Sequence, residues 1–189
     1  PCDGYTDPEK NKSVIMKDVF KKGDSYFITG DLVRDIGFRH AQFVDRLGDT
    51  FRWKGENVST TEVENIVSEY PKIAEAVVYG VEIPETNGRA GMAAITLLDG
   101  MTLCEQDLTD MVQVFKKNLP AYAVPVFLRI QQTVETTGTF KYQKNKLKDQ
   151  GYDLNQTSDQ LLVLLPSATA YTDLTTEIQA NIAAYKYRF

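Results

Sequence analysis

The sequence predicts an α+β fold in which helices cover a small sheet. Segments with helical periodicity alternate along the chain with short apolar runs of strand character. The chain has 189 residues, enough for one domain or for one domain and part of another. Its hydrophobic share of 42% and charged share of 25% are typical of a protein that buries its own core. Disordered, collagen-like and disulfide-scaffold classes are therefore disfavoured.

The N-terminal part of the chain is expected to form a β-hairpin. Residues 25–44 contain two β-rich runs joined by the turn Asp35-Ile36-Gly37. A further β segment, Thr50 to Trp53, leads into a glycine turn at residues 54–57. After this turn the periodicity changes from that of strands to that of helices.

The first predicted helix begins at a capping box formed by Ser59 and Glu62. Apolar residues follow at helical spacing, and Pro71 ends the pattern. Glu62 and Glu64 are assigned to capping and to the negative charge that a first helical turn favours.

A second capping box, Thr102 with Glu105, begins another amphipathic helix, which Pro120 ends. Strands and helices alternate here, which indicates a compact module up to about Gly151. Three apolar runs are expected to be its buried strands: residues 73–81, 90–98 and 126–130.

In the part of the chain after Gly151, the tail from Thr175 to Tyr187 is expected to be docked on this module and not bound to a membrane. A polar stretch leads to an apolar run at residues 161–165. A last amphipathic helix is predicted from about Thr175 to Ala184.

Charge and composition disfavour several partners. The net charge is -5, from 21 basic and 26 acidic residues that are mixed along the chain, so no basic block could follow the backbone of a nucleic acid.

Cys2 and Cys104 have neither disulfide-framework nor zinc spacing and are interpreted as reduced thiols in the cytoplasm. His40, the only histidine, is expected on a strand surface, and no bound metal is expected in this chain. No apolar run approaches the roughly 18 residues that span a bilayer.

Two residues of the predicted hairpin could bind a ribose. Asp31 follows a β run and a glycine, and its carboxylate could accept hydrogen bonds from both hydroxyls of a cis-diol. Arg46 offers a planar donor group to a ribose or a phosphate. From the residues alone, a turn aspartate that bonds its own backbone is the favoured interpretation of Asp31, and a salt bridge at the hairpin end explains Arg46 equally well.

Three further groups of residues could carry function. Gly48 and Asp49 lie where a domain boundary is expected, and a glycine there suits a hinge. The segment Trp53-Lys54-Gly55-Glu56 could line a channel, although a core tryptophan followed by a turn glycine explains it too. Lys141 follows a loop of small residues and could neutralise a transferring phosphoryl group, but it could also be a surface lysine.

Taken in chain order, these groups resemble successive motifs in the C-terminal part of the adenylate-forming acyl-CoA synthetases. The resemblance spans nearly the whole chain. The sequence of residues 45–64 and 80–93 resembles the very-long-chain acyl-CoA synthetase, or fatty acid transport protein, branch of this superfamily. The segment after Gly151 is similar to the C-terminal extension of that branch. The matching motifs are Tyr26…Thr29-Gly30-Asp31, Arg46…Asp49…Lys54-Gly55…Glu62-Val63-Glu64, Leu119-Pro120-Ala121-Tyr122-Ala123-Val124-Pro125 and Thr137-Gly138…Lys141.

The resemblance implies an activity and roles for these residues. Such enzymes join a fatty acid to ATP, with Mg²⁺, as an acyl-adenylate, and then pass the acyl group to the thiol of CoA. By resemblance, Asp31 and Arg46 hold the ribose of ATP, and Lys141 contacts carboxylate and phosphate during adenylation. The hinge would be Gly48-Asp49. After rotation of the small domain, the segment Trp53-Lys54-Gly55-Glu56 would face the pantetheine arm of CoA.

The resemblance also implies a division of the chain. Residues 1–47 would end the large N-terminal adenylation domain, residues 48–151 would be the mobile C-terminal domain, and residues 152–189 would be the extension. Pro1 is preceded by neither an initiator Met nor a leader, so we expect a piece of a longer protein. We expect this piece to be inactive alone, because the phosphate loop, the adenine site and the acyl tunnel of the family belong to its large domain. Membrane association could come only through the rest of the protein.

Two departures from the family pattern concern the site. Phe140 stands directly before Lys141, where the superfamily usually has glycine, and Gly48 stands where a charged residue is usual. Both fit the fatty acid transport branch. Two alternatives stay open: a non-catalytic module that binds CoA, acyl-CoA or a protein, and a CoA ligase for another carboxylate such as a bile acid.

Overall fold

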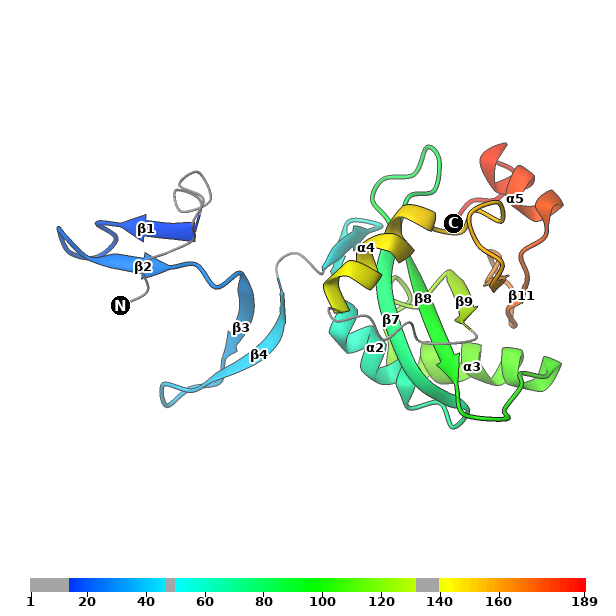
Figure 1. Cartoon of the computed structure of the whole chain (residues 1–189), viewed down its shortest axis with the longest axis horizontal. Coiled ribbons are helices and arrows are strands. Elements are labelled where there is room, and N and C mark those ends of the chain that lie inside the picture. The colour runs from blue at the N-terminus through cyan, green and yellow to red at the C-terminus, as the bar shows by residue number, and fades with distance from the viewer. Residues whose placement is uncertain (1–13, 47–49, 132–139) are drawn as a thin grey trace. The chain divides into compact units, whose positions relative to one another are not determined.

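The structure, a computed structural model, describes residues 14–46, 50–131 and 140–189, with side chains throughout except at residues 32, 44–46 and 140–143 (Figure 1). The chain divides into two compact units, Pro1–Gly48 and Asp49–Phe189. Each unit is described by itself below.

The first unit contains two antiparallel strand pairs. Strand β1 (Ile15–Lys17) pairs with β2 (Ser25–Phe27), and β3 (Asp31–Asp35) pairs with β4 (Ala41–Arg46). The turn predicted at Asp35-Ile36-Gly37 does join a hairpin, formed by β3 and β4. The prediction is wrong in the extent of its first run, because Ser25–Phe27 pairs with preceding residues instead.

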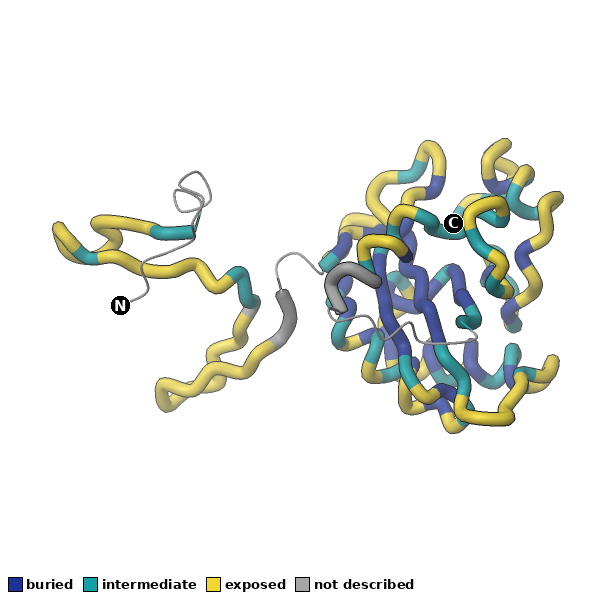
Figure 2. The backbone as a smooth tube through the Cα atoms, in the orientation of Figure 1, coloured by how far each residue is buried: buried dark blue, intermediate teal, exposed yellow. Residues whose placement is uncertain are grey.

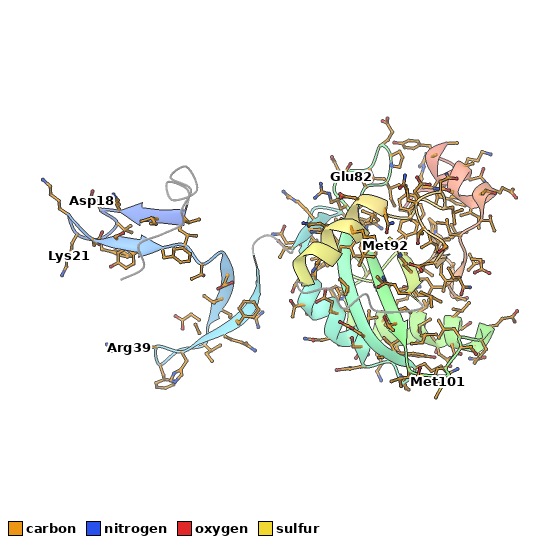
Figure 3. The ribbon with its side chains drawn as sticks, viewed as in Figure 1. Asp18, Lys21, Arg39, Glu82, Met92 and Met101 are labelled. Atoms are coloured by element: carbon orange, nitrogen blue, oxygen red, sulfur yellow. The ribbon has the colours of Figure 1, made fainter. Side chains whose placement is uncertain are left out.

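The turn between β1 and β2 explains this pairing. The carboxylate of Asp24 accepts hydrogen bonds from the backbone N–H groups of Val19, Phe20 and Lys21, at 2.7, 3.0 and 2.9 Å. These bonds close the turn in which Asp18 and Lys21 lie (Figure 3).

Apolar side chains of the first unit are widely exposed (Figure 2). Phe38, at the β3–β4 turn, is 95% exposed, and Phe20 is 80% exposed. Arg39 lies at the tip of the same hairpin (Figure 3), and His40 is exposed beside it. Two-stranded ribbons bury little surface on their own, so these residues gain no core within this unit. The exposed large apolar residues here are Met16, Val19, Phe20, Tyr26, Phe27, Ile28, Val33, Ile36, Phe38 and Phe43.

A five-stranded sheet forms the centre of the second unit. Its strand order is β11-β10-β9-β8-β7, and all neighbours are antiparallel except β8 and β9. A separate two-stranded hairpin precedes it. The strands are β5 (Phe51–Trp53), β6 (Glu56–Val58), β7 (Ile73–Val81), β8 (Ala90–Leu97), β9 (Phe127–Gln131), β10 (Gln160–Val163) and β11 (Thr172–Asp173).

Four helices cover this sheet. Helix α4 (Phe140–Gln150) crosses one face, whereas α2 (Thr60–Ser68) and α3 (Glu105–Asn118) lie behind the other, and α5 (Thr176–Ala183) follows β11 (Figure 1). The predicted α+β fold is confirmed. Ser59 caps α2 as expected, because its side chain accepts the backbone N–H of Glu62. None of the helices in the described ranges is both long and apolar enough to cross a membrane.

The C-terminal segment completes the sheet and its core. The apolar run at residues 161–165, which was not assigned to a strand, forms most of β10, and Leu161, Leu162 and Val163 are buried. The hydroxyl of buried Tyr171 donates to the carbonyl of Pro125 at 2.6 Å. The tail is docked as predicted, because Ile182 is buried and the side-chain amide of Gln179 donates to the carbonyl of Tyr152 at 3.4 Å.

The N-terminus of α3 differs from the prediction. The cap is Cys104 and not Thr102, because the backbone N–H of Cys104 donates to Asp107 at 2.7 Å. The carboxylate of Asp107 also accepts hydrogen bonds from the ammonium of Lys72 at 2.7 Å and from the hydroxyl of Tyr70 at 2.9 Å. These bonds, above all the one from Cys104, hold the pKa of Asp107 well below its usual range.

We expect Asp107→Asn to make stability less dependent on pH in the acid range. A carboxylate with a lowered pKa stabilises the fold above about pH 4, the ordinary pKa of an unfolded aspartate, and this contribution is lost as the pH falls toward the lowered value. The variant should lose about 1–3 kcal/mol in the free energy of unfolding near neutral pH. Urea unfolding at several pH values checks this, with exposed Asp99→Asn as control. A variant-to-parent difference that stays constant down to about pH 2 would contradict it.

Candidate functional site

Strand register brings the two candidate ribose ligands together. Asp31 and Arg46 are directly opposite each other in the β3–β4 pair. Gly30, which precedes Asp31, has φ +75°, a backbone conformation that glycine adopts without strain. The backbone N–H of Asp31 donates to the side chain of Thr29 at 3.2 Å. The side chain of Arg46 lies outside the described residues, as do both hinge candidates, Gly48 and Asp49.

The predicted glycine turn is the tip of the β5–β6 hairpin. Lys54 and Gly55 both have positive φ, at 51° and 87°. Trp53 is buried, only 2% exposed, whereas Lys54, Gly55 and Glu56 are exposed. The Lys54 ammonium lies 5.8 Å from the centre of the Trp53 ring. The hairpin therefore has its aromatic side chain in the core and its charged side chains in solvent.

Gly88 fixes this hairpin against the loop that precedes β8. The backbone N–H of Arg89 donates to the carbonyl of Arg52 at 2.7 Å, and Trp53 forms a β-bridge with Gly88. Gly88 has φ +95°, and a Cβ atom there would overlap the carbonyl oxygen of Arg52. Only glycine allows this close approach, so the hairpin position depends on a residue 30 and more positions away.

Helix α4 begins next to the candidate lysine. Lys141 is the second residue of α4, and its side chain is outside the described set. One turn further, the ammonium of Lys144 donates to Thr60 at 3.1 Å and to Glu64 at 3.3 Å. Both partners lie on α2, so this contact joins the two helices.

Glu64 has a different role from the one predicted. Its carboxylate accepts the backbone N–H of Val78 at 2.8 Å and the ammonium of Lys144 at 3.3 Å. Because Val78 lies on β7, Glu64 links α2, α4 and the sheet. Glu62, by contrast, stands in the first turn of α2 as expected.

The end of α4 is held by a buried guanidinium. Arg129, on β9, is 5% exposed and donates to Asp159 at 2.6 Å and to Gln150 at 2.8 Å. Gln150 is the last residue of α4. The sequence analysis missed Arg129, although a single arginine inside an apolar strand run is a signal that could have found it. Helix α4, which carries the candidate lysine in its first turn, is thus fixed at two points.

The described residues contain no group of three or more His, Cys, Asp and Glu side chains that could hold a metal ion. Cys104 is a free thiol and is exposed, and Cys2 lies outside the described ranges.

Known proteins resemble this chain in sequence. Residues 62–141 match the family described as the AMP-binding enzyme C-terminal domain. The medium/long-chain-fatty-acid–CoA ligase of Mycobacterium tuberculosis is 44% identical over 183 residues, which cover 97% of this chain and 30% of that protein. The mouse long-chain fatty acid transport protein 6 is 46% identical and is covered for 29% of its length. The chain therefore spans less than a third of the length of each of these two relatives.

A solved structure resembles the chain in fold. The o-succinylbenzoate CoA synthetase of Bacillus subtilis, in complex with its acyl-adenylate intermediate, has a TM-score of 0.56 and 25% sequence identity. The alignment covers 69% of this chain and 24% of the synthetase.

We expect Lys144→Met and Glu64→Gln to loosen α4. Each removes one partner of a largely buried ion pair, which should cost about 1–3 kcal/mol in the free energy of unfolding. Amide hydrogen exchange along residues 144–150 should accelerate in both variants. Asp149→Asn, an exposed side chain on the same helix, is the control. If α4 exchanges as slowly in both variants as in the control, the pair does not hold the helix.

Proposed function

We propose that the chain is the C-terminal part of an ATP-dependent fatty acid:CoA ligase, because residues 62–141 match the AMP-binding enzyme C-terminal domain family. The observation that carries the proposal is the 44% identity to a fatty-acid–CoA ligase over 97% of the chain, which includes both units. The alternative of a module that only binds CoA esters or a protein has no comparable support.

The proposed reaction has two steps. The carboxylate of the fatty acid attacks the α-phosphate of ATP, which forms an acyl-adenylate and releases pyrophosphate. The thiol of CoA then loses its proton and attacks the acyl carbon, which forms the thioester and releases AMP. Mg²⁺ would accompany ATP, where it neutralises phosphate charge. Both substrates of the first step are anions, so a cation between them lowers the barrier.

Lys141 is the proposed source of this cation. Its position in the first turn of α4 supports the role, because α4 is joined to α2 through Lys144 and to β9 through Arg129. A helix fixed in this way can present the same residue to a nucleotide in each catalytic cycle. The helix N-terminus itself also favours an anion nearby.

Asp31 and Arg46 are proposed to hold the ribose. The Asp31 carboxylate would accept hydrogen bonds from its two hydroxyls, and Arg46 would donate to the nucleotide. Their opposite positions in one strand pair support a shared ligand.

The chain is proposed to join two domains of the ligase. Residues 1–47 would end the large domain, residues 48–151 would be the mobile domain, and residues 152–189 would be its extension. The exposed apolar side chains of the first unit support this, because a preceding part of the protein could cover them. The hinge would lie at Gly48-Asp49.

The proposed location of the protein is the cytoplasm, which the free thiol of Cys104 fits. Long acyl substrates could bring the protein to a membrane surface.

The turn of the β5–β6 hairpin is proposed to face CoA. The segment Trp53-Lys54-Gly55-Glu56 would lie beside the pantetheine arm after rotation about the hinge. Exposed Gly55 supports this, because a residue without a side chain lets a ligand approach the backbone.

In the full-length protein, we expect Lys141→Ala to lower the rate of adenylate formation by about 100-fold or more, since it removes the cation between two anions. Thioester formation from preformed adenylate should be spared. Pyrophosphate exchange and single-turnover thioester assays measure the two steps. Lys146→Ala, which changes an exposed lysine on the same helix, should retain both. Equal loss of both steps in Lys141→Ala would remove the lysine from its proposed role.

Asp31→Asn in the full-length protein should raise the KM for ATP by about 10-fold, because the amide replaces one of two acceptors that bind the ribose. Arg46→Ala should act in the same direction. Initial rates at varied ATP concentration measure both, and Asp35→Asn, at the other end of β3, is the matched control. Unchanged KM values would place the ribose elsewhere.

A further inference from the structure

Helix α4 ends against residues of the C-terminal segment. Its last residue, Gln150, accepts a hydrogen bond from the Arg129 guanidinium at 2.8 Å and donates its side-chain amide to the carbonyl of Gln156, also at 2.8 Å. The same guanidinium donates to the carboxylate of Asp159 at 2.6 Å. Gln156 and Asp159 lie between α4 and β10, outside the family match at residues 62–141. The C-terminal segment therefore holds the end of α4 by two routes, one direct and one through Arg129.

The orientation of the Arg129 guanidinium depends on Asp159. The two side chains are only 6% and 20% exposed, so water has little access to replace either partner. The guanidinium is planar, and its Nε atom donates to Asp159 while its Nη1 atom donates to Gln150. A rotation that breaks the first bond also misaligns the second. Loss of the Asp159 carboxylate would therefore loosen the hold on Gln150.

The C-terminal segment has contacts of its own that fix Asp159. The backbone N–H of Asp159 donates to the hydroxyl oxygen of Thr157 at 3.1 Å, and β10, which follows directly, pairs with β9. The ring of Tyr152 stacks on that of Phe127 in β9, with the ring centres 4.3 Å apart. Because these contacts do not involve α4, Asp159 is a fixed point against which the helix is oriented.

We propose that Asp159 is a positioning residue for adenylation, which acts through Arg129 and Gln150 to set the direction of α4 and thus the place of Lys141. The inference rests on the proposed function, which assigns Lys141 as the cation between carboxylate and phosphate. Helix α4 is also held near its start by the Lys144 contact. If the end at Gln150 is released, the helix can rotate about that contact, and this displaces the first turn. A misplacement of about 1 Å can lower a rate about 100-fold.

The second step of the proposed reaction distinguishes positioning from general stability. Thioester formation from preformed adenylate does not use Lys141 in the proposed mechanism, so it does not depend on the direction of α4. A merely structural role of Asp159 would lower both steps alike, since it would reduce the amount of folded protein. Selective loss of the first step is therefore the signature of positioning.

In the full-length protein, Asp159→Ala should lower the rate of pyrophosphate exchange about 10-fold. The KM for ATP and thioester formation from preformed adenylate should stay within about 2-fold of the parent, because the bonds to the ribose and the second step are not affected. Gln150→Ala, which removes the contact on the helix itself, should show the same selective loss. Equal loss of both steps in Asp159→Ala, or retained exchange, overturns the proposal.

Asp173→Ala is the matched control. Its carboxylate also accepts a side-chain hydrogen bond within the C-terminal segment, from Gln160 at 2.7 Å. Asp173 lies on β11, at the opposite edge of the sheet from β7, over which α4 packs. This variant should retain both steps. If it loses exchange as selectively as Asp159→Ala does, the effect does not come from the contact with α4, and the proposal is overturned.

A double variant separates this inference from the proposed function. Adding Asp159→Ala to Lys141→Ala should lower exchange by less than about 2-fold further, because no lysine is left to position. A further loss of about 10-fold in the double variant overturns the positioning role while the role of Lys141 stands. If Lys141→Ala alone retains exchange, the proposed role of Lys141 fails, and the positioning role of Asp159 fails with it.

Discussion

The position of helix α4 depends on two ion pairs, one largely and one almost fully buried. Arg129 has its charged guanidinium buried at the sheet. Loss of its partner there would lower the free energy of unfolding by about 3–5 kcal/mol. Asp159 and Gln150 satisfy this guanidinium, and Gln150 thereby fixes the end of α4. Near the other end, Lys144 is held by Glu64. The residue proposed to meet the nucleotide therefore stands on an element whose two ends are tied to different parts of the core.

The same guanidinium makes the C-terminal segment part of the domain. Asp159 precedes β10, so detachment of this segment would leave Arg129 without its carboxylate and would expose the buried side chains of β10. The fold thus depends on residues that the matched family region does not include.

Local patterns predicted much of the fold, and long-range contacts account for most of what was missed. The Ser59 cap and the β5–β6 turn follow from neighbouring residues, and both are present. Cys104 replaced Thr102 as a cap because Asp107 is oriented by Lys72 and Tyr70, more than 30 positions away. For the candidate site, the motif order indicated which residues matter. It could not indicate the contacts that place them, such as Gly88 against Arg52 or Glu64 against Val78.

The Glu64 carboxylate has a consequence for self-association. Strand β7 is the last strand on its side of the sheet, and exposed N–H groups on such a strand invite pairing with a strand of another molecule. At Val78 this N–H is already occupied by a charged side chain that is itself held by Lys144. An incoming strand would have to displace this carboxylate and break its contact with the Lys144 ammonium. One side chain therefore both orients a helix and protects a sheet edge from aggregation.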